Sequence, residues 1–344
     1  MLRIGIAYSL KPVDRDDDGP DDRFEEFDKP ETIDALAEAI RGDGHDVVLL
    51  GDGREFLTKI LASPPDFVFN FAEGQGVGRD REARVPAVCE MLGVPYSGSD
   101  PLTMAVTLDK EMAKRLVRDH VMTPDGVIIH PECSIDEIRT RLEIAFPQFP
   151  TVIAKPTFEG SSKGIRGKAL AESAQEAAEL CAKLASEYRQ PILVEQFIGG
   201  DEVTVGVIGN GRDVSVLGAL RIVPVEPTRH FVYSLEMKRD WQRCVRYEAP
   251  AVVNEQEPGL LSLAAKNAYE ALGCRDIARI DFRVEDGVPY FIEANPLPGL
   301  APGTSDLVIL AQGYGIGHTE LVQRILRTAL ERVGLAGARM RIAP

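Results

Sequence analysis

Two apolar stretches near the C-terminal end of the chain carry acidic residues at inner positions and stop together at a proline. In "RIDFRVEDGVPYFIEANPLPG", residues 279–299, hydrophobic residues alternate with charged ones on both sides of "EDG", and Pro296 ends the second stretch. The alternation predicts two β-strands, and Gly287 in a left-handed conformation predicts a three-residue hairpin between them. Charged groups inside strands cost free energy unless a partner compensates them. The chain must therefore form an antiparallel ribbon that gathers partners for its own acids.

The expected register of this hairpin decides which side chains share a face. Asp281 faces Phe291 and Arg279 faces Glu293, which leaves Asp281 and Glu293 on a diagonal of ~7–8 Å between Cα atoms. Two residues further, Asn295 adds an amide oxygen on the same side. Two carboxylates and an amide oxygen suit Mg²⁺, which proteins usually hold through one or two carboxylates together with substrate phosphates. The alternative is a structural cluster in which the arginine neutralises both acids.

Composition narrows the class of protein to which this ribbon belongs. The 344 residues are 44% hydrophobic, which allows a large core and two or three domains. The formal net charge of −15 argues against a general nucleic-acid binder. No apolar run approaches the ~20 residues that span a bilayer, and the opening "MLRIGIAYSL" is not a signal peptide. Five scattered cysteines fit a reducing cytoplasm, where we expect the protein to act.

Strand and helix patterns divide the chain into three parts. Residues 1–103 alternate strand and helix, which predicts an α/β domain with a doubly wound parallel sheet. Residues 104–190 and 191–344 mix the two patterns less regularly, so we expect two α+β subdomains. One acidic segment, "DRDDDGPDDRFEEFD" (14–28), interrupts the first part. It is either a solvated loop, as charge runs usually are, or a lid that attracts an amine or a metal.

Two glycine-rich segments are candidates for binding a nucleotide. "GSSKGIRGKA" (160–169) follows the predicted strand "TVIAKP", and its flexible N–H groups and two hydroxyls can close over phosphate oxygens, although it lacks Walker A spacing. Lys155 ends that strand, where a nearby phosphate would offset the cost of its charge unless the side chain reaches solvent. "EGQGVGR" (73–79) has G-x-G-x-G spacing in place of the dinucleotide fingerprint, so it is weak support for a nicotinamide site.

Several ordered segments resemble the ATP-grasp superfamily, and within it the D-alanine–D-alanine ligase family. They are "GVPYSGSDPLTMAVTLDK", "VIAKPTFEGSSKGI", "ILVEQFIGGDEVTVGV", "ALGCRDIARIDF" and "YFIEANPLPGL". The resemblance spans roughly residues 65–330. It implies an ATP-grasp fold, in which the two α+β subdomains clasp ATP, and it implies dimerisation and small amino-acid or amine substrates.

The resemblance also implies a role for individual residues. For ATP, it implies phosphate contacts from Lys110 and Lys155, a closing loop of Glu159, Gly160, Ser161 and Ser162, an adenine hinge of Glu195, Gln196, Phe197 and Ile198, and a ribose contact from Glu202. Asp281, Glu293 and Asn295 match the ligands of Mg²⁺ or Mn²⁺. For catalysis, Arg279 would stabilise the tetrahedral transition state, the Gly299 N–H would serve its oxyanion pocket, and Lys238 would reach the γ-phosphate, with Ser161 in the closing loop.

The reaction implied is an ATP-dependent ligation of a carboxylate to an amine. The carboxylate becomes an acylphosphate, and the amine then displaces phosphate. Other readings remain beside it. A biotin-carboxylase-like or carboxylate–thiol ligase shares the fold, a regulatory nucleotide-binding module would not need Arg279, and a nicotinamide oxidoreductase rests on "GQGVG" alone.

The match to the family fails in four places, all at substrate contacts. The acidic segment 14–28 replaces a Gly-Gly-x-Ser-x-Glu segment, and "NFAEG", with Glu73, replaces a His-Gly pair. Arg239 stands where the mobile loop normally has tyrosine, which predicts either an anionic group on the substrate or a solvent-facing side chain. "GTSD" offers Ser305 as the contact for the second carboxylate. We therefore expect the chemistry of the family to be kept and either D-alanine or another amino acid or amine to be joined.

Overall fold

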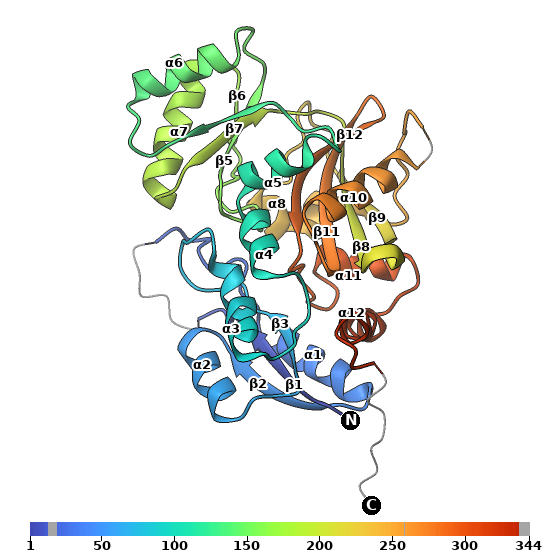
Figure 1. Cartoon of the computed structure of the whole chain (residues 1–344). Helices are drawn as coiled ribbons and strands as arrows, with labels where there is room; N and C mark the ends of the chain where they lie inside the picture. Colours follow the sequence, from blue (N-terminus) through green and yellow to red (C-terminus); the bar gives the residue numbers. More distant parts are fainter. Residues whose placement is uncertain (13–18, 258, 337–344) are drawn as a thin grey trace, which may run out of the picture.

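The computed structural model describes residues 1–12, 19–257 and 259–336, and the strands in those ranges form three sheets. Figure 1 shows the sheets as three bodies, with the N-terminal one below and the other two above it. No helix among the described residues has the length and apolarity needed to cross a bilayer.

The N-terminal sheet is parallel, in the order β2-β1-β3. Its strands are β1 (Arg3–Tyr8), β2 (Asp46–Gly51) and β3 (Phe67–Phe71), and its helical segments are α1 (Pro30–Gly42), α2 (Gly53–Ala62), η1 (Arg81–Ala83) and α3 (Arg84–Leu92). Helix α1 begins with proline at its first turn and buries Ile33, Leu36, Ala37 and Ile40, which recur at the spacing of one helical face. The predicted parallel sheet is confirmed.

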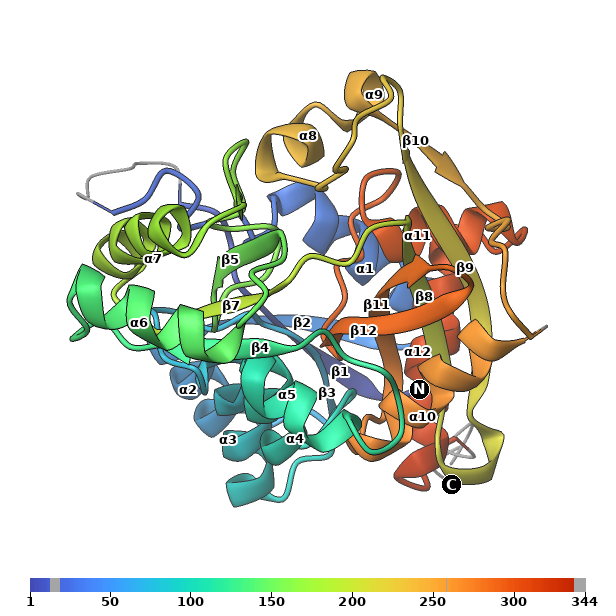
Figure 2. The same ribbon diagram turned by 90° about the horizontal axis from the view of Figure 1, so that it is seen from above.

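The middle of the chain forms a four-stranded antiparallel sheet in the order β4-β7-β5-β6. Its elements are β4 (Gly126–Ile129), α6 (Ile135–Ala145), β5 (Val152–Pro156), β6 (Leu170–Ala171), α7 (Ala174–Tyr188) and β7 (Ile192–Gln196). Figures 1 and 2 both show α6 and α7 side by side on the side of this sheet that faces away from the third sheet. Its other side is therefore left to face the C-terminal subdomain.

The third sheet is antiparallel, in the order β10-β9-β8-β11-β12. Its strands are β8 (Asp201–Gly209), β9 (Ser215–Pro224), β10 (Val245–Glu248), β11 (Asp276–Glu285) and β12 (Val288–Asn295). The helical segments of this part are η2 (Gly211–Asp213), α8 (Leu235–Arg239), α9 (Trp241–Cys244), α10 (Leu260–Ala271), α11 (Asp306–Gly313) and α12 (His318–Arg332). The α+β character predicted for both later parts is confirmed.

Three helices join the bodies to one another. Helices α4 (Pro101–Leu108) and α5 (Lys110–Val117) follow the N-terminal domain, and α5 packs on the five-stranded sheet through Ala113 and Val117. At the other end of the chain, Leu326 and Ala329 of α12 share a core with α1 and the parallel sheet. The three sheets follow one another along the chain in the predicted order. The predicted boundaries do not separate the packing, because α5 packs on the five-stranded sheet and α12 packs on the N-terminal domain.

Candidate active site

The hairpin β11–β12 places its acids closer together than the sequence predicted. The connection has two residues, Asp286 and Gly287, both with positive φ (49° and 79°), because Glu285 pairs with Val288. The predicted three-residue hairpin is therefore wrong. Two-residue turns with left-handed residues match the twist of the flanking strands, which explains why this one forms.

A bulge then corrects the alternation along β12. Phe282 pairs with Phe291 but Asp281 pairs with Glu293, so Ile292 is one extra residue in the second strand. The two carboxylates stand directly opposite each other on one face, not on the predicted diagonal. The bulge thus serves the site, because without it the acid of β12 would point to the other face.

Each acid of the pair has its own cations. The Arg279 guanidinium donates to both carboxylate oxygens of Asp281, at 3.0 and 2.8 Å, and the Glu293 carboxylate lies 3.0 Å from Lys110 Nζ. Burial alone would raise the pKa of Glu293, but Lys110, Lys155 and Arg279 outweigh it and lower that pKa to about 2. Burial, with the neighbouring Glu293 charge, raises the pKa of Asp281.

This donor set fits a divalent cation only when substrate oxygens complete it. No group of three or more His, Cys, Asp and Glu side chains in the described ranges is arranged to hold a metal. Asp281 and Glu293 supply two carboxylates, and the Asn295 amide donates to Asp281 at 3.1 Å, so it would have to turn to offer its oxygen. Mg²⁺ is commonly held in this way, by one or two carboxylates and phosphates.

The predicted lysines converge on the same region, and a further lysine joins them. Lys155, 3% exposed, forms a short ion pair with Glu195, and Lys114 contacts the other oxygen of that carboxylate at 2.6 Å. These contacts give Glu195 a charge-balancing role, and its predicted contact with adenine stays a prediction. Lys114 was missed, although it lies one turn after Lys110 on α5, the spacing that puts two side chains on one helical face.

The predicted adenine and ribose residues line a small cavity of about 110 Å³ between the second and third sheets. Gln196, Phe197, Ile198 and Glu202 all contribute to its wall. Arg283, which the sequence reading also missed, donates to the Ile198 carbonyl at 3.0 Å and to Glu202 at 2.8 Å, and it lies 4.9 Å from the centre of the Phe197 ring. Arg283 thus links Ile198 to Glu202. Its position two residues beyond Asp281 on the same strand face was the available signal.

The glycine-rich loop bends back over these lysines. Ser161 and Ser162 both have positive φ (49° and 60°), a conformation that non-glycine residues adopt only when their surroundings hold them. Ser162 donates to the Tyr233 carbonyl at 3.0 Å, and Glu159 accepts from Gln190 at 2.7 Å and forms a short ion pair with Lys163. The loop is fixed on both sides, and Ser162 lines the small cavity.

Residues 19–28 of the acidic segment help to hold that loop. Glu26 accepts from the Gly160 N–H at 2.6 Å and from Lys163 at 2.7 Å, and Asp22 is fully buried. The solvated-loop reading is wrong for Asp22 and Glu26, because basic groups and backbone donors of the glycine-rich loop draw these two acids inward, whereas Asp21 is exposed. The rest of the segment lies outside the described residues.

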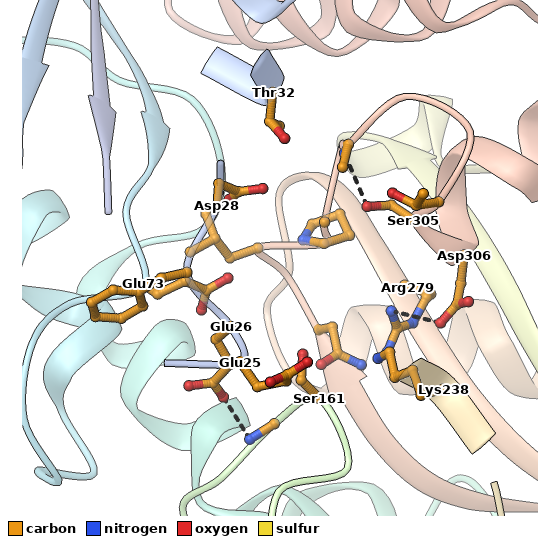
Figure 3. Close-up of a pocket in the computed structure, with 18 of the residues that line it drawn as sticks. Glu25, Glu26, Asp28, Thr32, Glu73, Ser161, Lys238, Arg279, Ser305 and Asp306 are labelled. Atoms are coloured by element: carbon orange, nitrogen blue, oxygen red, sulfur yellow. Dashed lines mark hydrogen bonds and ion pairs between the residues drawn. The ribbon is translucent and has the colours of Figure 1, made fainter. Parts of the chain in front are cut away.

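The expected acyl-transfer residues surround a larger cavity of about 790 Å³, which Glu293 and Asn295 also line. Arg279, Gly299, Ser305 and Lys238 all line it, and Ser305 Oγ accepts from the Ala301 N–H at 2.9 Å. Figure 3 shows Arg279, Lys238, Ser305 and Asp306 on one side, Asp28, Glu73, Glu25 and Glu26 on the other, and Ser161 between them. The cavity therefore connects the reacting groups to the N-terminal domain.

Arg239 lines the larger cavity and is also paired with two acids. Its guanidinium contacts Glu25 at 2.8 Å and Asp21 at 3.1 Å. Its predicted contact with an anionic substrate stays a prediction. Glu73, predicted at a substrate contact, does line the cavity, and burial together with nearby acids raises its pKa well above the usual range.

Comparison with known proteins agrees with this geometry. A family model described as "D-ala D-ala ligase C-terminus" matches residues 129–327. A D-alanine–D-alanine ligase of Ralstonia nicotianae is 33% identical over 251 residues, 72% of this chain and 71% of that protein. The uncharacterized protein y4sG of Sinorhizobium fredii is 32% identical over 312 residues, 87% of each.

A solved structure extends the likeness to the whole fold. The crystal structure of D-alanine–D-alanine ligase from Bacillus anthracis complexed with ATP has a TM-score of 0.72 at 22% identity, and the match covers 98% of this chain and 100% of that one. The ATP-grasp fold predicted from the ordered sequence segments is thus confirmed in three dimensions.

Proposed function

Because the chain belongs to the D-alanine–D-alanine ligase family of ATP-grasp enzymes, we propose that its described residues carry out that family's reaction with Mg²⁺. As a member, it is an ATP-dependent, ADP-forming ligase that makes a dipeptide or related amide, and peptidoglycan biosynthesis is the pathway that the family implies. The roles of single residues, the metal and the substrates are our proposals. A cytoplasmic location and a homodimer stay predictions.

Nucleotide binding is assigned to the small cavity and its lysines. Lys110 and Lys155 would contact phosphate oxygens, exchanging part of their ion pairs with Glu293 and Glu195 for them. Asp281, Glu293 and Asn295 would hold Mg²⁺, which would neutralise charge on the transferring phosphoryl group. Lys238 lines one small hollow together with Ser161, Asp281 and Glu293. It can therefore reach the transferring phosphoryl group.

Acyl transfer is assigned to the larger cavity. Arg279 lines the larger cavity and, with Asp281 and Glu293, a smaller hollow. Its guanidinium can stabilise the oxyanion that forms when the amine attacks the acylphosphate. The Gly299 N–H would donate to the same oxygen. The loop of residues 159–162, held down by Glu26, would exclude water, which otherwise hydrolyses an acylphosphate.

The single observation that carries this proposal is the direct pairing of Asp281 with Glu293 beside Lys110. We expect Glu293→Gln to abolish amine-dependent ADP release in a coupled assay with D-alanine, ATP and Mg²⁺. Glu270→Gln, the same change on the exposed side of α10, is the matched control and should keep full turnover. Unchanged turnover of Glu293→Gln, with an intact circular dichroism spectrum, contradicts the metal assignment.

A further inference from the structure

An acidic side chain, Asp306, lies beside Arg279 in the wall of the larger cavity. It is the first residue of α11, and it is 6% exposed. Its carboxylate lies 3.5 Å from the Arg279 guanidinium and accepts from the Tyr247 hydroxyl at 3.2 Å. Asp306 also lines the smaller hollow. Figure 3 shows it on the same side of the cavity as Arg279 and Ser305.

The local structure uses only part of what this carboxylate can accept. A carboxylate has about four acceptor positions, and the hydroxyl and the guanidinium N–H occupy two of them at long distances. Arg279 donates to both oxygens of Asp281 at 3.0 and 2.8 Å, so its charge is balanced without Asp306. An acid at the start of a helix is favourable, but an exposed one serves that purpose as well. Asp306 thus keeps free acceptor positions in the cavity wall.

Two tyrosines fix the orientation of the Asp306 carboxylate. Tyr247 donates its single hydroxyl proton to Asp306, so the Tyr233 hydroxyl, 2.6 Å away, must donate to Tyr247. Burial and the charge of Asp306 raise the pKa of both tyrosines, which therefore stay protonated. The Tyr233 carbonyl in turn accepts from Ser162 at 3.0 Å. The carboxylate is thus held by a chain of contacts that begins at the glycine-rich loop.

The expected positions of the substrates bring the attacking nitrogen to this carboxylate. Ser305, the residue before Asp306, is the predicted contact for the carboxylate of the second substrate, and Arg279 is the proposed partner of the oxyanion. The nitrogen and the oxyanion are bonded to one carbon in the tetrahedral intermediate. A group in contact with Arg279 is therefore close to the nitrogen as well, and a substrate that reaches from Ser305 to Arg279 passes Asp306.

The other acids near the reacting groups are occupied or lie elsewhere. Within the described ranges, the acids that line the smaller hollow are Glu202, Asp281, Glu293 and Asp306. Glu202 contacts Arg283 at 2.8 Å, and Asp281 and Glu293 are proposed for Mg²⁺. Figure 3 shows its labelled acids of the N-terminal domain across the larger cavity, and no described histidine lines either space. Asp306 is therefore the acid placed to meet an amine at Arg279.

We propose that Asp306 is a catalytic residue that binds the attacking amine and accepts its proton. This role deepens the proposed ligase function and rests on it. An amino acid arrives as an ammonium ion, in which a proton occupies the lone pair of the nitrogen. Transfer of that proton to the Asp306 carboxylate frees the pair for attack on the acyl carbon.

The remaining steps follow from this transfer. The freed pair forms the C–N bond while the carbonyl pair moves onto the oxygen beside Arg279. That pair then re-forms the carbonyl, the C–O bond to phosphate breaks, and phosphate leaves with the electrons of that bond. The nitrogen gives its second proton to the leaving phosphate, which yields a neutral amide. Asp306 finally returns its proton to water.

The test compares two nucleophiles in Asp306→Asn, made in the full-length protein. At neutral pH an amino acid arrives charged and needs a proton acceptor, whereas hydroxylamine is largely uncharged and does not. With ATP, Mg²⁺ and D-alanine, we expect kcat for amine-dependent ADP release to fall about 10²-fold or more. Hydroxamate formation from D-alanine and saturating hydroxylamine, measured by its colour with iron(III), should stay within about threefold of the natural chain.

Two further variants separate the proton acceptor from a structural acid. Asp136→Asn is the matched control, because Asp136 also lies in the first turn of a helix and pairs with an arginine, but it is exposed. It should keep both rates. Tyr247→Phe removes the hydroxyl that orients Asp306 and should lower the amine-dependent rate alone, about three- to tenfold. This variant decides the question if Asp306→Asn does not fold.

The outcomes distinguish this role from the proposed function. An unchanged amine-dependent rate in folded Asp306→Asn overturns the role and leaves the ligase assignment standing. An equal loss with both nucleophiles also overturns the role, because Asp306 would then act before the amine attacks. If the natural chain forms neither ADP nor hydroxamate with any D- or L-amino acid, the ligase assignment and this role are both contradicted.

Discussion

The two ends of the active-site region treat buried charge in opposite ways. At the nucleotide end, Lys110 is paired with Glu293, and Lys114 and Lys155 share Glu195. At the N-terminal end, the carboxyls of Glu73 and Glu82 lie in the cavity wall without such partners. At the nucleotide end the charges are compensated before phosphates bind. At the N-terminal end the two carboxyls gain a partner only when a ligand binds. The nucleotide end thus has the residues expected for the family's chemistry, whereas the N-terminal end is where the sequence departs from the family.

The largest expected effect comes from the residue that stands between the two ends. Arg279→Lys keeps a positive charge beside Asp281 but loses the planar fork that contacts both of its oxygens. We expect kcat to fall about 10²–10³-fold, with the KM for ATP changed by less than about threefold. Steady-state ADP release measures both, and a rise in the KM for ATP with unchanged kcat would move Arg279 to the nucleotide end.

A smaller effect should follow from Lys114→Met. Glu195 then keeps only Lys155 as a partner, and that lysine is held more firmly away from phosphate. We expect the Kd for ATP to rise about tenfold, measured by calorimetry. Arg118→Met, at the exposed end of α5, is the control. Equal ATP affinity in the two variants would show that the paired lysines do not act together.

The unpaired acids predict a dependence of stability on pH in the absence of substrate. The folded-state pKa values of Glu82 and Asp28 are raised to about 7, so between about pH 4 and 7 the folded protein binds more protons than the unfolded chain. Stability should therefore fall by about 1 kcal/mol or more from pH 5 to 7.5. The charges that face Glu82 are Arg81, Glu26, Lys110 and Lys163.

Urea unfolding at the two pH values measures this change. Glu82→Gln should reduce the loss of stability between pH 5 and 7.5, because the group that takes up the proton is gone. An identical pH dependence in the variant and in the natural chain would falsify the view that Glu82 is held without a partner.

The smallest effect is expected at the contact between Arg239 of helix α8 and the acidic segment. Arg239 is about one third exposed, and exposed ion pairs such as those with Asp21 and Glu25 contribute less than about 1 kcal/mol. Arg239→Gln should therefore lower the melting temperature by a few degrees at most and raise the KM for the amine no more than about threefold. A loss of activity above tenfold would show that this arginine contacts substrate.

The same contrast explains what could be read from the sequence. The nucleotide end depends on residues close together in one strand pair or one helix. Alternation was enough to find Asp281 and Glu293, whereas the family resemblance supplied Lys110. The bulge at Ile292 could not be foreseen from alternation. The shorter turn and the bulge each shift the register by one residue in the same direction, so together they return Glu293 to the face of Asp281. The prediction that Asp281 and Glu293 share a face was right, although the predicted register was wrong.

The substrate end depends on residues far apart in the chain. Glu26 contacts Gly160 of the glycine-rich loop. Glu82 and Asp28 line one cavity because the fold of the N-terminal domain brings them together. A run of acids has no period that reveals burial, so the composition of segment 14–28 favoured solvent. The partners of Arg239 were hidden for the same reason, since they lie in that segment.

The packing of α12 against α1 has a consequence for how the protein is made. The apolar side of α1 and the parallel sheet share their core with Leu326 and Ala329, which the ribosome adds long after α1. Until then, the N-terminal domain has an uncovered surface and must be kept from aggregating while the two later sheets emerge. A chain cut short before residue 318 therefore leaves the N-terminal core unfinished.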